Sequence, residues 1–97
     1  MSEVPADGAA EHDPAARQFR VGEGGDAAVL QYRRSAERIT LLHTEVPKAL
    51  RGHGVAQRLA RAALEYAKNE SLRVVPLCPF VQSYVRKHPE YRDLIDE

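Results

Sequence analysis

The sequence predicts a small α/β domain in which about four strands form one mixed sheet that two helices cover. Three observations predict this class. Short extended runs separated by tight turns occupy the chain up to Pro47, a helical hydrophobic period follows over residues 54–69, and a second apolar run leads into a second helix. Short links favour antiparallel neighbours, and a helix between two strands favours a parallel pair. We therefore expect three antiparallel strands and then one parallel strand.

The first half of the chain predicts strands over residues 16–21, 27–34 and 38–46. Their residues favour extended structure, and Pro47 ends the third strand because it has no N–H to donate to a ladder. Strict alternation along the third strand places its side chains on two faces: Ile39, Leu41, His43 and Glu45 on one, and Thr40, Leu42, Thr44 and Val46 on the other.

The second half predicts a helix over residues 54–69, a buried strand over residues 72–78 and a second helix that starts at Pro79. His88-Pro89 should end this second helix, since a residue before proline disfavours helical backbone. Residues 1–15 are rich in Ala, Glu and Asp and predict a disordered tail, which leaves residues 16–97 as a single domain.

Composition excludes several classes of function. The chain has 97 residues and a formal net charge of zero, so a basic nucleic-acid-binding surface is not expected. It has no apolar run of transmembrane or signal-peptide type, so we expect no membrane partner. A single cysteine, Cys78, fits a reducing cytoplasm, and with four histidines it offers no zinc spacing, so we expect no metal.

The tract Arg51-Gly52-His53-Gly54-Val55-Ala56 lies between the third strand and the first helix. Its glycines let the backbone approach a ligand closely, and the helix that follows offers unpaired N–H groups with the positive end of its dipole. This order of elements predicts a phosphate site, and nearby basic residues should make the local field positive. The alternative is a plain turn before a helix.

Several motifs in order carry a family resemblance: His43-Thr44-Glu45-Val46-Pro47, the Arg51–Ala56 tract, Val75-Pro76-Leu77-Cys78 and His88-Pro89-Glu90-Tyr91. With them the chain closely resembles the small, stand-alone GNAT-like N-acetyltransferases over residues 19–94. The resemblance implies the minimal GNAT fold and acetyl-CoA as cosubstrate. It also implies an open acceptor site, because only a short turn replaces the two helices that usually follow the first strand. An exposed amine, such as a protein lysine, then suits the site, and we expect a monomer.

The resemblance implies where the cofactor lies. The diphosphate would bind the backbone N–H groups of residues 52–56, with Arg51 adding charge. The pantetheine arm would lie where the third strand parts from the strand over residues 72–78. The implied cofactor-binding residues are Thr44, Val46, Arg51, Gly52, His53, Gly54, Val55 and Ala56.

Four residues are candidates for catalysis. His43 is a proposed general base, because its ordinary pKa lies near neutrality, and Glu45 could hold its ring or compete for the role. Cys78 could face His43 across the gap, either as a transient nucleophile or as a packing residue, and we favour direct transfer with Cys78 lining the site. Tyr84 resembles the tyrosine that protonates the departing thiolate in many family members, and a core role is the alternative.

Two other functions stay open at this stage. One is a CoA-binding or acyl-CoA-binding module with little catalysis. An acceptor site that no helices cover would permit this function. The other is a nucleotide-binding or partner-docking domain that uses the glycine loop for a different phosphate.

Overall fold

A mixed sheet of five strands organises the chain, which a computed structural model describes over residues 10–22 and 24–96. The strands are β1 (Glu11–Asp13), β2 (Gln18–Val21), β3 (Ala28–Arg34), β4 (Arg38–Glu45) and β5 (Arg73–Pro76). The helices are α1 (Val55–Asn69) and α2 (Pro79–Lys87), and the 3₁₀ turns are η1 (Gly24–Asp26), η2 (Lys48–Leu50) and η3 (Pro89–Leu94). No helix among these residues is long and apolar enough to cross a membrane.

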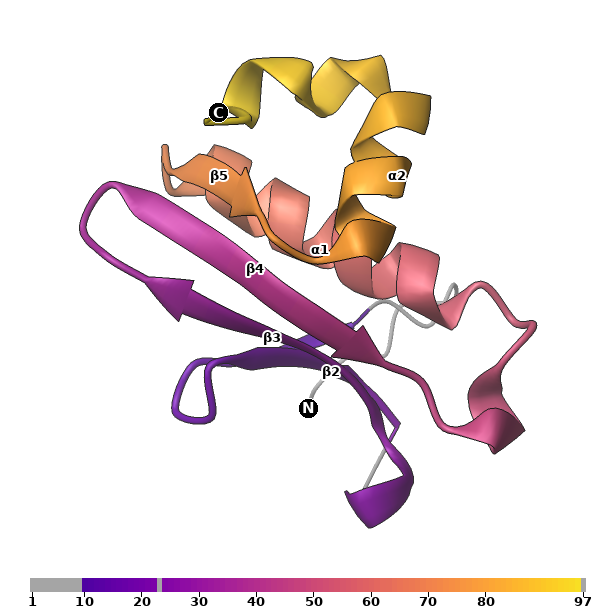
Figure 1. The fold of residues 1–97 in the computed structure, drawn as a ribbon. Coiled ribbons are helices and arrows are strands. Elements are labelled where there is room, and N and C mark those ends of the chain that lie inside the picture. The colour runs from indigo at the N-terminus through magenta and orange to yellow at the C-terminus, as the bar shows by residue number, and fades with distance from the viewer. Residues whose placement is uncertain (1–9, 23, 97) are drawn as a thin grey trace.

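The strands lie side by side in chain order, and every pair is antiparallel except β4 and β5. Figure 1 shows α1 behind the sheet. In the sequence this helix connects β4 to β5, and a parallel pair of strands requires such a crossover connection. The predicted mixed sheet and both helices are confirmed. Helix α2 ends at Lys87, directly before His88-Pro89.

Strand β1 corrects two expectations, the number of strands and the extent of the tail. It lies within residues 1–15, which we expected to be disordered, and pairs with β2. The ring of His12 stacks on Phe19 at 4.4 Å and bonds the hydroxyl of Tyr32 at 2.6 Å. These partners supply apolar contact that the composition of the tail does not show. The part of the expected tail over residues 1–9 lies outside the described residues.

A bulge in β4 corrects the predicted alternation. Leu41 pairs with Tyr32 and His43 pairs with Gln31, so Leu42 is an extra residue without a partner in β3. Beyond the bulge the two faces exchange. Thr44 now pairs with the buried Leu30 on the face that α1 covers, whereas His43 and Glu45 leave from the opposite face.

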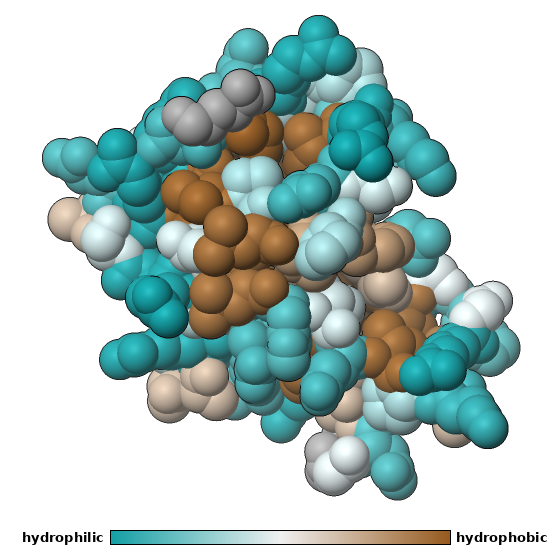
Figure 2. Space-filling view, in the orientation of Figure 1, coloured by the Kyte–Doolittle hydropathy of each residue, from teal (hydrophilic) through white to brown (hydrophobic). Residues whose placement is uncertain are grey.

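Helix α1 packs on the sheet with a face rich in small residues. Its buried residues are Val55, Leu59, Ala60, Ala63, Leu64 and Ala67. Three of the six are alanines, which let the helix approach the strands closely. Helix α2 packs against α1 and the end of β4, and together these elements bury the core. The other face of the sheet carries exposed side chains at Gln31, Arg33 and His43, and Figure 2 shows it as hydrophilic residues around smaller apolar patches.

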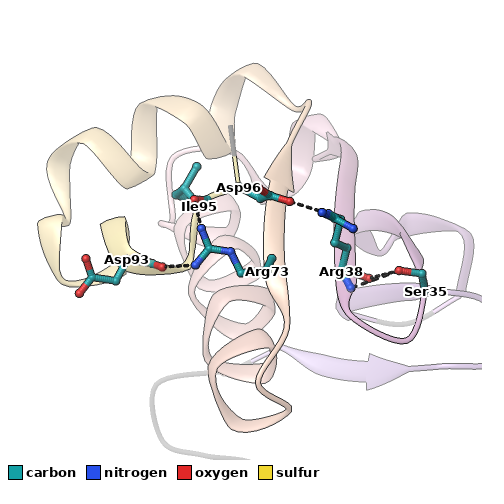
Figure 3. A network of polar contacts seen from close by, with 6 residues as sticks. All are labelled: Ser35, Arg38, Arg73, Asp93, Ile95 and Asp96. Carbon is teal, nitrogen blue, oxygen red and sulfur yellow. Dashed lines mark hydrogen bonds and ion pairs between the residues drawn. The ribbon is translucent and has the colours of Figure 1, made fainter.

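The C-terminal segment covers the free edge of β5. Ile95 forms a parallel bridge with Val74, and the N–H of Asp96 donates to the Val74 carbonyl at 2.8 Å. The guanidinium of Arg73 donates to the carbonyls of Asp93 and Ile95, at 2.7 Å each, and Arg38 pairs with the Asp96 carboxylate (Figure 3). Because the edge is covered, it does not offer a template for a further strand.

Candidate active site

Strands β4 and β5 part in the middle of β4. Their pairing runs from Arg38 and Arg73 to Leu41 and Pro76, and then the N–H groups of Leu77 and Cys78 both donate to the Leu41 carbonyl at 3.0 Å. Pro76 has no N–H to extend the ladder, and the chain turns into α2 at once. Residues 42–45 of β4 therefore continue without a β5 partner, and the predicted splay of the two strands is confirmed.

The glycine loop needs both of its glycines. Gly52 has φ of +84° and Gly54 has φ of +71°, which is the left-handed region that side chains disfavour. A Cβ on Gly52 would meet no atom within 4 Å, so the backbone there is open to a close approach. Gly54 is the N-cap of α1 and makes no side-chain cap bond. The first N–H groups of α1 are therefore left for a ligand.

Two hollows that share lining residues lie beside this loop and the C-terminal end of β4. The first, of about 320 Å³, is lined by Val46, Leu50, Arg51, Gly52, Gly54, Val55, Ala56, Gln57 and Phe80. The second, of about 410 Å³, is lined by Gly25, Ala27, Thr44, Glu45, Val46, Pro47 and Arg51. Val46 and Arg51 belong to both, and Arg51 donates through Nε to the Val46 carbonyl at 3.0 Å. The two hollows together form a path from the start of α1 to the free end of β4.

Seven of the eight residues expected to bind the cofactor line this path. The exception is His53, which is exposed and lines neither hollow. Sequence reasoning missed Leu50, Gln57 and Phe80 as lining residues. Phe80 had a usable signal, because it follows Pro79 in the first turn of α2 and so lies directly beside the end of β5.

His43 and Glu45 lie together on the uncovered face of the sheet. The His43 Nε2 atom is 3.8 Å from a carboxylate oxygen of Glu45, and their side chains are 51% and 70% exposed. Alternate residues of a strand share a face, and the two side chains lie on the same face, as the sequence predicted. Both groups are accessible to a partner that approaches this face.

Cys78 lies on the other side of β4. It is 2% exposed, and its Sγ atom is 3.3 Å from the hydroxyl oxygen of Thr44. The expectation that the thiol faces His43 is therefore wrong, because the bulge at Leu42 turns Thr44 toward Cys78 and His43 away from it. The thiol contacts the free end of β4 from within the core.

Tyr84 belongs to α2, and its buried side chain lies between this helix and the turn η3. Its ring stacks on His88 at 4.0 Å and lies 6.3 Å from the ring of Tyr91. Burial raises the pKa of its phenol above the ordinary value, although the charge of Arg61 acts in the opposite direction. The residue of α2 that lines the first hollow is Phe80.

The comparison with protein families decides the identity of this fold. The profile of the GCN5-related N-acetyl-transferases matches residues 18–94, which include the whole path and all four catalytic candidates. The chain belongs to this family.

Relatives of this GCN5-related N-acetyltransferase align with it over most of their length. Protein NATD1 of Homo sapiens is 46% identical over 82 residues, which are 81% of this chain and 73% of that protein. Protein NATD1 of Danio rerio is 39% identical over 90 residues, which are 88% of this chain and 82% of that protein. A solution structure of a GCN5-like protein from Staphylococcus aureus has a TM-score of 0.70 at 25% identity, covering 94% of this chain and 90% of that one.

Over residues 10–22 and 24–96, no three His, Cys, Asp or Glu side chains lie together in a way that could hold a metal ion.

Proposed function

We propose that this chain is an acetyl-CoA-dependent N-acetyltransferase that transfers the acetyl group directly to an exposed primary amine, such as a protein lysine. One observation carries the proposal. The free end of β4 and the uncapped start of α1 line two hollows that share Val46 and Arg51, so a single extended ligand can bind both. Acetyl-CoA has that form, with a diphosphate at one end and an amide-bearing arm that leads to the thioester.

The diphosphate would occupy the start of α1. Residues 52–56 lead into the start of α1, where the helix dipole is positive, and neither glycine adds a side chain that would block the approach. Arg51 lines both hollows and adds positive charge next to the loop.

The pantetheine arm would follow the free end of β4. Main-chain groups of Thr44 and Val46 can pair with its amides as an added strand would, since β5 has already left the ladder. This places the thioester near the contact between Thr44 and Cys78.

The acceptor amine would approach from the uncovered face. His43 accepts a proton from the ammonium group, the free amine attacks the thioester carbonyl, and the bond to sulfur breaks as CoA thiolate leaves. Glu45, 3.8 Å from the ring, orients the imidazole and stabilises its charged form. Leu77, 57% exposed beside Cys78, offers apolar contact to the methylene chain of a lysine.

Burial supports a packing role for Cys78 and leaves the acid role of Tyr84 without support from geometry. A thiol that is 2% exposed and bonded to Thr44 suits a wall of the site better than a nucleophile. A tyrosine that stacks on His88 and Tyr91 contributes to the core, and the departing thiolate can take its proton from water.

A thiol-release assay tests the proposed reaction. Acetyl-CoA is incubated with a lysine-bearing peptide, and free CoA is measured together with the mass of the peptide. Release that depends on the peptide and matches its gain of one acetyl group is the expected result. Affinity for CoA should exceed affinity for ATP, because only CoA carries the arm that pairs with β4.

A CoA-binding module with little catalysis is the second candidate. Two observations favour it. His43 and Cys78 lie on opposite faces of β4. Among the described residues, Glu45 is the one carboxylate within ion-pair distance of His43. Tight CoA binding without peptide-dependent release of thiol would select this candidate. A monomeric state and a cytoplasmic location stay predictions.

A further inference from the structure

A third hollow, of about 440 Å³, lies between α2 and the C-terminal segment. Its lining residues are Pro76, Gln82, Val85, Arg86, Arg92 and Ile95. None of them lines the path proposed for acetyl-CoA. Two arginines and one glutamine therefore line this space, and its other lining residues are apolar.

The walls of this hollow are held in place by hydrogen bonds. The amide of Gln82 donates to the Pro76 carbonyl at 2.8 Å, which fixes α2 against β5. On the opposite side, Arg73 donates to the carbonyls of Asp93 and Ile95, as Figure 3 shows. Ile95 is thus held directly by Arg73, and Arg92 directly precedes the anchored Asp93. A preformed site loses less conformational freedom when a ligand binds.

The charge of the hollow selects an anion. Over residues 10–22 and 24–96, the ion pairs of arginine involve Arg20, Arg34 and Arg38, and no carboxylate lies within ion-pair distance of Arg86 or Arg92. Two like charges at one hollow repel each other, and an anion between them removes that repulsion. A guanidinium fits the planar carboxylate through two parallel hydrogen bonds, and the apolar walls suit the methylene groups that carry such a carboxylate.

Two residues of this hollow are close in the chain to Cys78, which lies at the acyl end of the proposed path. Pro76 precedes Cys78 by two residues, and the N–H of Gln82 donates to the Cys78 carbonyl at 3.0 Å. We propose that this hollow binds a carboxylate side chain of the acceptor, so that the preferred substrate is a lysine with an acidic residue close to it in the sequence. This inference rests on the proposed function, whose acceptor it specifies.

Peptide titrations test the inference without any acetyl transfer. Blocked peptides with one lysine carry Glu, or Gln in its place, at positions two to four residues from the lysine, and binding is followed by amide chemical shifts. We expect the Glu peptide to bind about tenfold more tightly than the Gln peptide, as two charge-assisted hydrogen bonds would give. The shifts should concentrate at Gln82, Arg86 and Arg92, and they should weaken at high salt.

Substitutions in α2 and η3 supply the controls. Arg86→Gln with Arg92→Gln should abolish the preference for Glu, and Lys87→Gln, an exposed change on the same helix, should keep it. Arg86→Lys with Arg92→Lys retains the charge but lacks the paired N–H donors of a guanidinium, so it should show an intermediate preference for the Glu peptide. This variant replaces the neutral one as the test if the neutral variant fails to fold. Equal affinity for the two peptides, or a preference that survives in the double Gln variant, overturns the inference.

Two further measurements separate the possible failures. Free glutarate should bind more weakly than the Glu peptide, and binding as tight as that of the peptide would contradict a carboxylate on the acceptor. Titration with CoA is followed at residues 52–56. If CoA changes the chemical shifts of residues 52–56 but the Glu peptide binds no more tightly than the Gln peptide, only the present inference is overturned. If the Glu peptide binds more tightly but CoA changes no shifts there, the proposed function is overturned.

Discussion

The sulfur of Cys78 lies 3.3 Å from the hydroxyl oxygen of Thr44, at the point where β4 has lost its β5 partner. This contact joins the end of the parallel ladder to the free end of β4 that is proposed to bind pantetheine. It also explains why the thiol is buried while the neighbouring His43 is open to solvent. The roles of both residues follow from this geometry and can be tested separately.

Cys78→Ala should leave turnover within about threefold of wild type, because direct transfer needs no acyl-thiol intermediate, and should cost about 1 kcal/mol of stability as a small core truncation. Steady-state thiol release and thermal unfolding measure the two effects. Turnover lost by about a hundredfold with CoA affinity unchanged, or an acetyl group found on Cys78 by mass spectrometry, would restore the role of nucleophile.

His43→Ala should lower kcat about a hundredfold and change the affinity for acetyl-CoA little, since general bases contribute roughly this much and His43 lines neither hollow of the path. Gln31→Ala is the matched control, because Gln31 is the exposed cross-strand partner of His43. The measurement is kcat and KM over a range of pH. A His43→Ala variant with the rate of the Gln31→Ala variant would remove His43 from the mechanism.

Gly54→Asp should lower the affinity for CoA by more than tenfold, because aspartate repels a diphosphate, and should also lower Tm, because a side chain at φ of +71° is strained. Gly54→Asn has the same shape without the charge and should lose much less affinity. Calorimetric titration of both variants gives the comparison. Equal affinities for the aspartate and asparagine variants would show that no anion binds at the start of α1.

Stability should fall as the pH drops below about 6.5. Burial lowers the pKa of His12, with Arg34 adding to the effect and Asp13 opposing it. The unfolded chain then binds a proton at a higher pH than the folded chain does, so protons favour unfolding in the window between the two pKa values. Urea unfolding across this window measures the slope, and His12→Gln should flatten it. An unchanged slope in that variant would contradict the burial of an uncharged ring.

Elements set by local signals could be predicted from the sequence. The helical period and the glycine before it gave α1 over residues 55–69, and proline at its first turn marked the start of α2. The parallel strand followed from the helix between two apolar runs. Much of the lining of the first hollow was expected from the same local pattern, because Arg51, Gly52, Gly54, Val55 and Ala56 belong to one loop and one helix start.

Long-range contacts account for what the sequence did not reveal. Strand β1 depends on the packing of His12 against Phe19, Tyr32 and Tyr66, and nothing within residues 1–15 shows those partners. The bulge at Leu42 is one extra residue in an otherwise regular run, so it leaves the alternating pattern intact while it reverses the faces. For that reason the expectation that Cys78 faces His43 was wrong.

Chemical-shift mapping with acetyl-CoA tests the central claim most directly, because it reports on each main-chain amide of the path. The account predicts that the largest shifts occur at the amides of residues 52–56 and at Thr44 and Val46 beside the parted strands. Saturable binding that leaves the amides of residues 52–56 unmoved would contradict it.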